Sequence, residues 1–125
     1  MLAHAAPLPT ARAIPGDGRR LPVVGLGTWQ TFDVGADTAA RANLGRLLAR
    51  FVEQDGQVVD NSPMYGSAVA VVGDLARERG LRQRLFLATK MWTRGAEAGI
   101  AQMQESLRRL GSERIELMQV HNLLD

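Results

Sequence analysis

Short apolar runs alternate along the chain with stretches in which apolar residues recur every three or four positions. The short runs predict four strands at residues 23–29, 58–59, 85–89 and 115–120. The helical spacing between them predicts three helices, which stop at Gly56, Gly80 and Gly111. Connections of this length are typical of βαβ crossovers, so the order of elements predicts a parallel sheet.

Turn-forming residues come before the first strand. Residues 14–21 hold a proline and two glycines between apolar ends, which predicts a short hairpin. We expect residues 1–12 to form a mobile amino-terminal tail or a signal remnant, and residues 13–125 to form the folded part. The predicted fold class is α/β, the amino-terminal half of a (β/α)8 TIM barrel with about four parallel strands and three helices, because a complete barrel takes roughly 250 residues. Its open sheet edges favour self-association.

Composition narrows the function classes. Of 125 residues, 46% are hydrophobic and 22% charged, which is ordinary for one soluble globular domain. The net charge is only +2 and the arginines are scattered, so we expect no nucleic-acid partner. No apolar run reaches the roughly 18 to 20 residues of a membrane span, and we expect no membrane partner. We expect a cytoplasmic protein, or a periplasmic one if an upstream signal peptide is missing.

Four polar residues follow predicted strands and form the candidate catalytic set. Asp60 and Tyr65 follow residues 58–59, Lys90 follows residues 85–89, and His121 follows the last strand. Because the carboxyl ends of parallel strands meet, these side chains are expected to lie together. Tyr65 is the only tyrosine, and Lys90 is the only lysine among 15 cationic residues. Lys, unlike Arg, is compact and tunable, so its placement indicates a chemical role.

The four residue types suit protonation of a carbonyl oxygen. A phenol has an ordinary pKa of about 10 and donates a proton near neutral pH only if a nearby cation stabilises the phenolate. Lys90 supplies that cation, Asp60 holds it, and His121 orients a substrate oxygen. The set lacks a Ser or Cys nucleophile and makes a poor metal site, so we expect no metal. The electrons must then come from a hydride-donating cofactor.

Four segments carry a resemblance to the aldo-keto reductases. They are Leu21 to Trp29, Val59 to Ser67, Ala88 to Trp92, and Gln119 to Asn122, in the family's order and at appropriate spacing. The resemblance implies Tyr65 as general acid, Lys90 with Asp60 as the pair that lowers its pKa, and His121 as the group that orients the carbonyl. It implies NADPH as cofactor and a small-molecule carbonyl as substrate. By the same resemblance, the cofactor-binding residues are Gly27, Thr28 and Asp60, and the substrate-binding residues are Trp29, Trp92, His121 and Asn122.

Other interpretations stay open at this point. Taken singly, a tyrosine in a loop often packs, a lysine at a strand end is often solvated, and the tryptophans suit a barrel rim as well as a substrate pocket. The glycines at residues 25 and 27 do not form a dinucleotide-binding loop, because position 30 is Gln. Val69 and Glu116 stand where the family often has Glu and Asp, with local effects expected. The alternative function is a non-catalytic fragment, or an assembly or nucleotide-sensing module descended from the family.

Overall fold

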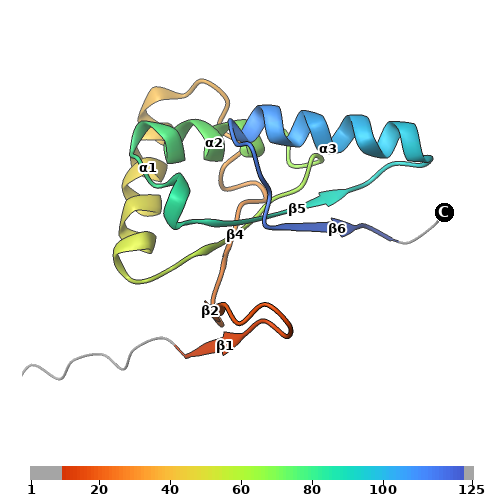
Figure 1. Ribbon diagram of the computed structural model, residues 1–125. Helices are drawn as coiled ribbons and strands as arrows, with labels where there is room; N and C mark the ends of the chain where they lie inside the picture. The colour runs from red at the N-terminus through yellow and green to blue at the C-terminus, as the bar shows by residue number, and fades with distance from the viewer. Residues whose placement is uncertain (1–9, 123–125) are drawn as a thin grey trace, which may run out of the picture.

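A four-stranded parallel sheet is the centre of the fold in the computed structural model, which describes residues 10–122. Its strands run in chain order: β3 (Leu26–Gly27), β4 (Val58–Asp60), β5 (Phe86–Met91) and β6 (Leu117–Val120). Each connection between neighbouring strands contains a helix, and Figure 1 shows all three helices on one side of the strands. The predicted βαβαβαβ order after a short hairpin is confirmed.

The helices begin and end close to the predicted signals. Helix α1 (Thr38–Glu53) starts at Asp37, whose carboxylate accepts a hydrogen bond from the Ala40 amide at 2.9 Å, as N-cap residues do. Helix α2 (Ala68–Glu78) ends two residues before Gly80. Helix α3 (Ala96–Leu110) ends at Gly111, which adopts the left-handed conformation that favours glycine. A short 3-10 helix, η1 (Arg82–Arg84), was not predicted.

Helix α2 has no side-chain cap at its amino-terminal end. Ser67 occupies the N-cap position, but its side chain makes no hydrogen bond to the first turn of the helix. Its hydroxyl instead donates to the Asp33 carboxylate at 2.7 Å. The side chain therefore joins two loops rather than capping the helix.

The hydrophobic core lies between the helices and the sheet. Helix α2 contributes most to it, with seven of its 11 residues buried. Its contact with α3 depends on Gly73, where an added Cβ would lie 2.5 Å from the Arg109 carbonyl oxygen and 2.7 Å from the Leu110 main chain. A glycine here allows two helix backbones to approach closely. The core side chains are Phe32, Leu44, Leu48, Val52, Val59, Ala68, Val69, Val71, Val72, Leu75, Ala76, Leu85, Leu87 and Leu110.

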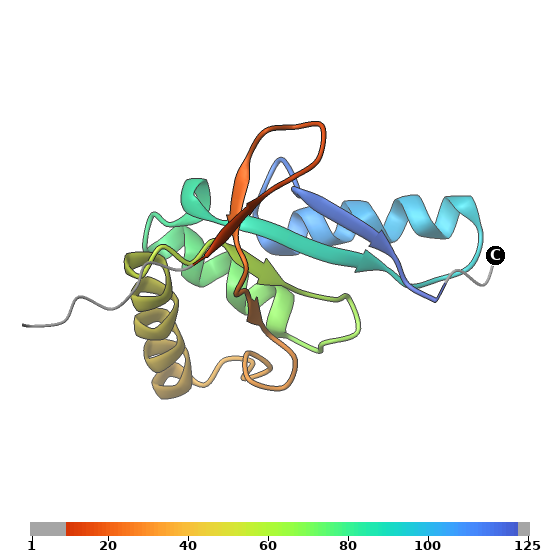
Figure 2. The same ribbon diagram turned by 90° about the horizontal axis from the view of Figure 1, so that it is seen from below.

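The predicted hairpin is present on the other side of the sheet. Strands β1 (Ala11–Ala13) and β2 (Arg20–Pro22) pair antiparallel, and Figure 2 shows the hairpin crossing in front of β5. The Arg19 guanidinium lies 5.4 Å from the centre of the Phe86 ring and ties the hairpin to the sheet. Strand β1 includes residues 11 and 12, which the sequence assigned to the tail; residues 1–9 lie outside the described part of the chain.

Two sequence expectations need correction. The first core strand is not a buried strand over residues 23–29, because β3 has two residues and the Val24 side chain is 65% exposed. The helical spacing of Ile100, Met103, Leu107 and Leu110 also predicts one buried face on α3, but Leu110 is buried whereas Ile100 is 55% exposed. An apolar residue at helical spacing is buried only where another element covers it, and no described element covers this part of α3.

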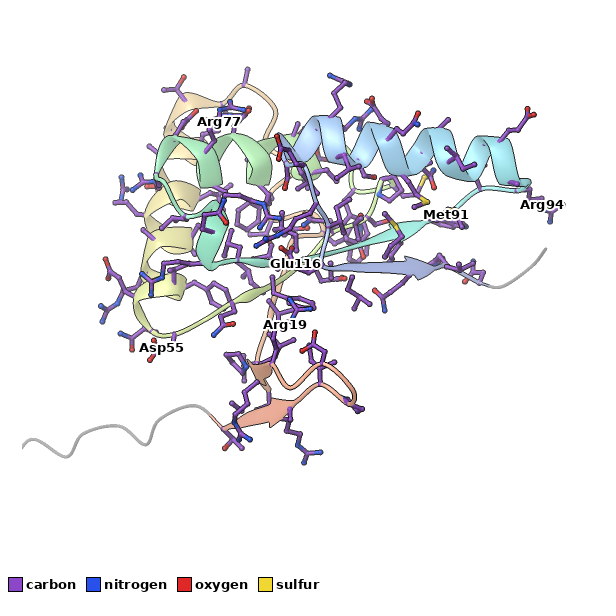
Figure 3. The ribbon with its side chains drawn as sticks, in the orientation of Figure 1. Arg19, Asp55, Arg77, Met91, Arg94 and Glu116 are labelled. Carbon is purple, nitrogen blue, oxygen red and sulfur yellow. The ribbon has the colours of Figure 1, made fainter. Side chains whose placement is uncertain are left out.

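Glu116 fastens the amino-terminal end of the sheet. Its carboxylate accepts hydrogen bonds from the Leu87 amide at 2.8 Å and from Arg82 at 3.0 Å, and it pairs with Arg114. Burial raises the pKa of Glu116, but these donors outweigh burial and hold the pKa below its ordinary value. In Figure 3, Glu116 lies close to Arg19 of the hairpin.

Among residues 10–122, no helix is long and apolar enough to cross a lipid bilayer.

Candidate active site

The strand register brings three of the four predicted catalytic residues to one end of the sheet. Asp60 is the last residue of β4, Lys90 is the penultimate residue of β5, and His121 follows β6 directly. Parallel pairing aligns these ends, with Asp60 opposite Ala88 and Lys90 opposite Gln119. Figure 3 shows Met91, which ends β5, far from Asp55, which precedes β4. The candidate site thus lies at the carboxyl end of the sheet.

Lys90 and Asp60 form a close ion pair. The Lys90 ammonium donates to both carboxylate oxygens of Asp60, at 2.8 and 2.7 Å, and to the Asn61 main-chain oxygen at 2.8 Å. An ammonium has three protons, so these three acceptors match its donors in number. The Lys90 side chain is only 14% exposed, whereas that of Asp60 is 40% exposed. Asp60 and Asn61 therefore hold the Lys90 ammonium in a fixed place just beneath the surface.

Tyr65 lies next to this charge on the loop between β4 and α2. The Lys90 nitrogen is 5.4 Å from the centre of the Tyr65 ring. The ring is half-buried, and a tilted Trp29 ring lies 6.5 Å from it, centre to centre. Within the described residues the phenol forms no hydrogen bond, so it is free to donate to a bound molecule.

A second loop holds the Tyr65 loop from outside. The Asp33 carboxylate accepts from the Ser67 amide at 2.8 Å, and the Gly35 amide donates to the Ser67 hydroxyl at 2.9 Å. Donation from Ser67 lowers the pKa of the Asp33 carboxyl. Gly66 between Tyr65 and Ser67 has a φ of +57°, and an added Cβ there would collide with Asp33. We call these hydrogen bonds between Asp33 and Ser67 the Asp33 brace. Sequence reasoning missed it, because the two residues lie 34 positions apart and no local pattern around Asp33 indicates the contact.

His121 occupies the neighbouring strand end, beside Trp92. The two rings are 4.7 Å apart at 45°, and the His121 amide donates to the Met91 carbonyl at 2.9 Å. Trp92 is held in turn by Gln102 of α3, whose side-chain amide bonds both the Trp92 amide and its carbonyl. Within the described part of the chain, the imidazole has no hydrogen bond, and its ring contact is with Trp92 rather than Tyr65. His121 is placed at the same end of the sheet but is not joined to the other three.

The remaining candidate residues differ in how they are placed. Gly27 lies opposite Asp60 in the sheet register, and a Cβ built on it meets no atom within 4 Å. Trp29 is 63% exposed, and Asn122 is exposed with a φ of +71°. Thr28 is fully buried, and its hydroxyl lies 2.8 Å from the Asp60 main-chain oxygen. No atom of Thr28 is accessible at the surface, so the structure does not support the cofactor contact that resemblance assigns to it.

No cluster of three or more His, Cys, Asp or Glu residues suited to a metal ion occurs between residues 10 and 122. The site geometry instead combines a half-buried phenol, an ammonium fixed by a carboxylate and a nearby imidazole. The model of the aldo/keto reductase family matches residues 23–123. The chain belongs to the aldo/keto reductase family.

Similar proteins support this assignment across most of the chain. Methylglyoxal reductase YeaE of Escherichia coli is 34% identical over 105 residues, which are 81% of this chain and 35% of that protein. Glycerol 2-dehydrogenase (NADP(+)) of Saccharomyces cerevisiae is 32% identical over 107 residues, which are 83% of this chain and 31% of that protein. The chain thus spans about a third of the length of these relatives.

Solved structures of the family have the same fold. An aldo/keto reductase from Klebsiella pneumoniae in complex with NADP and acetate is 30% identical, with a TM-score of 0.71 over 82% of this chain and 36% of that one. A putative aldo-keto reductase from Pseudomonas aeruginosa is 26% identical, with a TM-score of 0.76 over 90% of this chain and 46% of that one. The four strands and three helices form the amino-terminal half of a (β/α)8 barrel, as the sequence predicted.

Proposed function

We propose that this chain carries the proton-donating site of an NADPH-dependent reductase that converts aldehydes or ketones to alcohols. The observation that carries this proposal is the Lys90 ammonium, fixed by Asp60 at 2.7 Å and lying 5.4 Å from the Tyr65 ring. A fixed cation beside a phenol favours the phenolate that remains after proton transfer. Membership of the aldo/keto reductase family supports the same chemistry.

Tyr65 is the proposed general acid. Its hydroxyl proton goes to the carbonyl oxygen of the substrate while that carbonyl accepts a hydride at carbon, so the product is an alcohol and the phenol becomes a phenolate. The Lys90 charge stabilises the phenolate, and Asp60 keeps the ammonium in place through two hydrogen bonds. Water then returns a proton to Tyr65, which is half-buried rather than sealed from solvent.

The exposed face around Gly27 fits the nicotinamide part of the cofactor. The space above Gly27 is open, Trp29 flanks it, and Asp60 lies beside it in the register. NADPH supplies the hydride when it is bound. Two similar structures are complexes with NADP or NADPH, which supports this choice of cofactor.

His121, Trp92 and Asn122 are the proposed substrate contacts. The His121 ring lies 4.7 Å from the Trp92 ring, tilted by 45°, and has an N–H to offer to a carbonyl oxygen. Trp92 is 41% exposed, and Asn122 is exposed next to His121. Together with Trp29 they would border a small carbonyl compound with aromatic surface on two sides.

The test is NADPH consumption with a small aldehyde by this chain, and by a fusion of this chain to the remaining part of the Escherichia coli relative that it matches. Tyr65→Phe keeps the ring and removes the proton donor, and we expect it to lower kcat at least about 100-fold, as loss of a general acid does. Met64→Leu changes the adjacent exposed side chain and serves as the matched control, with unchanged kcat. Equal turnover by the Tyr65→Phe fusion, or no turnover by the unaltered fusion, would contradict the proposal.

A second candidate function is assembly with a second copy of the same chain. Strands β3 and β6 are the outer strands of the described sheet, and β6 exposes Leu117 and Val120. Open edges with exposed apolar residues favour pairing with another chain. Sedimentation of the chain over a range of concentrations should then show a dimer or larger species, whereas a monomer at all concentrations would exclude this function.

A further inference from the structure

One buried hydroxyl lies between the two residues that hold Lys90. The Thr28 Oγ1 atom is 2.8 Å from the Asp60 main-chain oxygen and 3.0 Å from the Asn61 side-chain oxygen Oδ1. Thr28 and Asn61 are both fully buried. Thr28 follows the two-residue strand β3, so its side chain continues the link to β4 after the main-chain ladder has ended.

The position of the Lys90 ammonium depends on these same two residues. Asp60 supplies two of its acceptors through the carboxylate, and Asn61 supplies the third through its main-chain oxygen. The Asn61 main-chain amide donates to the Ala88 carbonyl at 2.8 Å, which fixes the peptide group between Asp60 and Asn61 from the side of β5. From the side of β3, the Thr28 hydroxyl fixes it. A shift of the main chain at Asp60 and Asn61 would therefore move all three acceptors of Lys90.

The number of protons available decides which groups in this cluster donate and which accept. A hydroxyl has one proton, so Thr28 cannot donate to two oxygens at once. If it donates to the Asp60 carbonyl, its own oxygen is free to accept from the Asn61 side chain. In the structure the Asn61 Oδ1 faces Thr28, and the buried Nδ2 has no partner within the described residues. With Nδ2 turned toward Thr28, both short contacts become hydrogen bonds in a chain that runs from Asn61 through Thr28 to Asp60.

We infer that Thr28 is a positioning residue for Lys90. It acts through the main chain of Asp60 and the side chain of Asn61 and makes no contact with the reacting atoms. Its hydroxyl sets where the ammonium lies beside Tyr65, which is a different role from the cofactor contact that resemblance assigns to Thr28. The consequence for catalysis rests on the proposed function, but the effect on the Lys90 ammonium can be measured without any turnover.

Three variants of the 125-residue chain test this inference. Thr28→Val removes the hydroxyl at nearly constant shape, and Thr28→Ser restores a hydroxyl. Thr89→Val is the matched control, because the Thr89 hydroxyl is equally buried but has no hydrogen-bond partner among the described residues. The readout is the nitrogen-15 NMR signal of the ammonium, which arises from a single residue because Lys90 is the only lysine.

We expect the Lys90 ammonium protons to exchange with water about fivefold to tenfold faster in Thr28→Val than in the unaltered chain, the factor that corresponds to one lost hydrogen bond. Thr28→Ser and Thr89→Val should keep the slow exchange. Equal exchange rates in Thr28→Val and the unaltered chain would overturn the inference and leave the proposed reductase function standing.

A measurement on the unaltered chain covers the case in which Thr28→Val does not fold. The Thr28 hydroxyl proton should exchange slowly enough to give its own NMR signal, because the group is fully buried and donates to a main-chain oxygen. A Thr28 hydroxyl that exchanges freely with water would overturn the inference. In the catalytic fusion, Thr28→Val should lower kcat without weakening NADPH binding, whereas weaker binding with unchanged kcat would indicate a direct cofactor contact.

Discussion

Removal of Asp60 and removal of Lys90 should have unequal effects on stability, although the two residues form one ion pair. The Lys90 side chain is 14% exposed and the Asp60 side chain is 40% exposed. Asp60→Asn leaves an ammonium with a main-chain oxygen and an amide as its only acceptors in a nearly buried position. Lys90→Met leaves a carboxylate that water can reach.

The expected magnitudes follow from this difference in exposure. Breaking a fully buried pair costs about 3 to 5 kcal/mol, and an exposed pair is worth about 0 to 1 kcal/mol. The Lys90 pair is intermediate, and a neutral amide oxygen still accepts one hydrogen bond. We therefore expect Asp60→Asn to lower the free energy of unfolding by about 2 kcal/mol and Lys90→Met by about 0.5 kcal/mol.

Urea unfolding of the two single variants and the double variant measures these costs. The double variant should be about as stable as Lys90→Met, because the unpaired ammonium that destabilises Asp60→Asn is absent. Equal losses for the two single variants, or a double variant with the sum of both losses, would refute the argument from exposure.

Two further predictions concern the scaffold. Gly73→Ala should destabilise the chain by about 1 to 2 kcal/mol, because the added Cβ meets the main chain of α3. Gly45→Ala should be neutral or stabilising, because its Cβ meets only the flexible end of the Arg79 side chain. Urea unfolding measures both, and equal effects of the two variants would contradict the close approach of α2 and α3. The pKa of Glu116 is held below its ordinary value of 4.5, so Glu116 stabilises the fold above that pH and loses this contribution as the pH falls through the lower, folded value. Glu116→Gln should therefore make stability fall less steeply below about pH 4.5, measured as thermal unfolding against pH, and an unchanged slope would contradict this role.

Periodic features of the fold were predictable from sequence. Helical spacing and the terminal glycines placed all three helices, because an amphipathic helix that packs on a sheet leaves a repeat in the sequence. The strand ends placed Asp60 and Lys90 together, because parallel register aligns them. For the helices and for these strand ends, the local sequence pattern was enough to predict the structure.

Features that depend on distant partners were not predictable. The run at residues 23–29 has the composition of a buried strand, but only two of its residues pair with β4 and Val24 is exposed. The Asp33 brace and the Thr28 hydroxyl both bridge more than 30 residues of sequence, and no local pattern records such contacts. The same limit applies to Ile100, whose burial depends on what lies against α3 rather than on its spacing.

The central claim is that the Lys90 ammonium lies beside the Tyr65 ring at the end of the sheet. Because the chain has one tyrosine and one lysine, a nuclear Overhauser effect between the Lys90 side-chain protons next to Nζ and the Tyr65 ring protons can be assigned without ambiguity. With Nζ 5.4 Å from the ring centre, the account predicts that this signal is observed in the folded chain. A folded chain in which the two side chains show no such signal would contradict it.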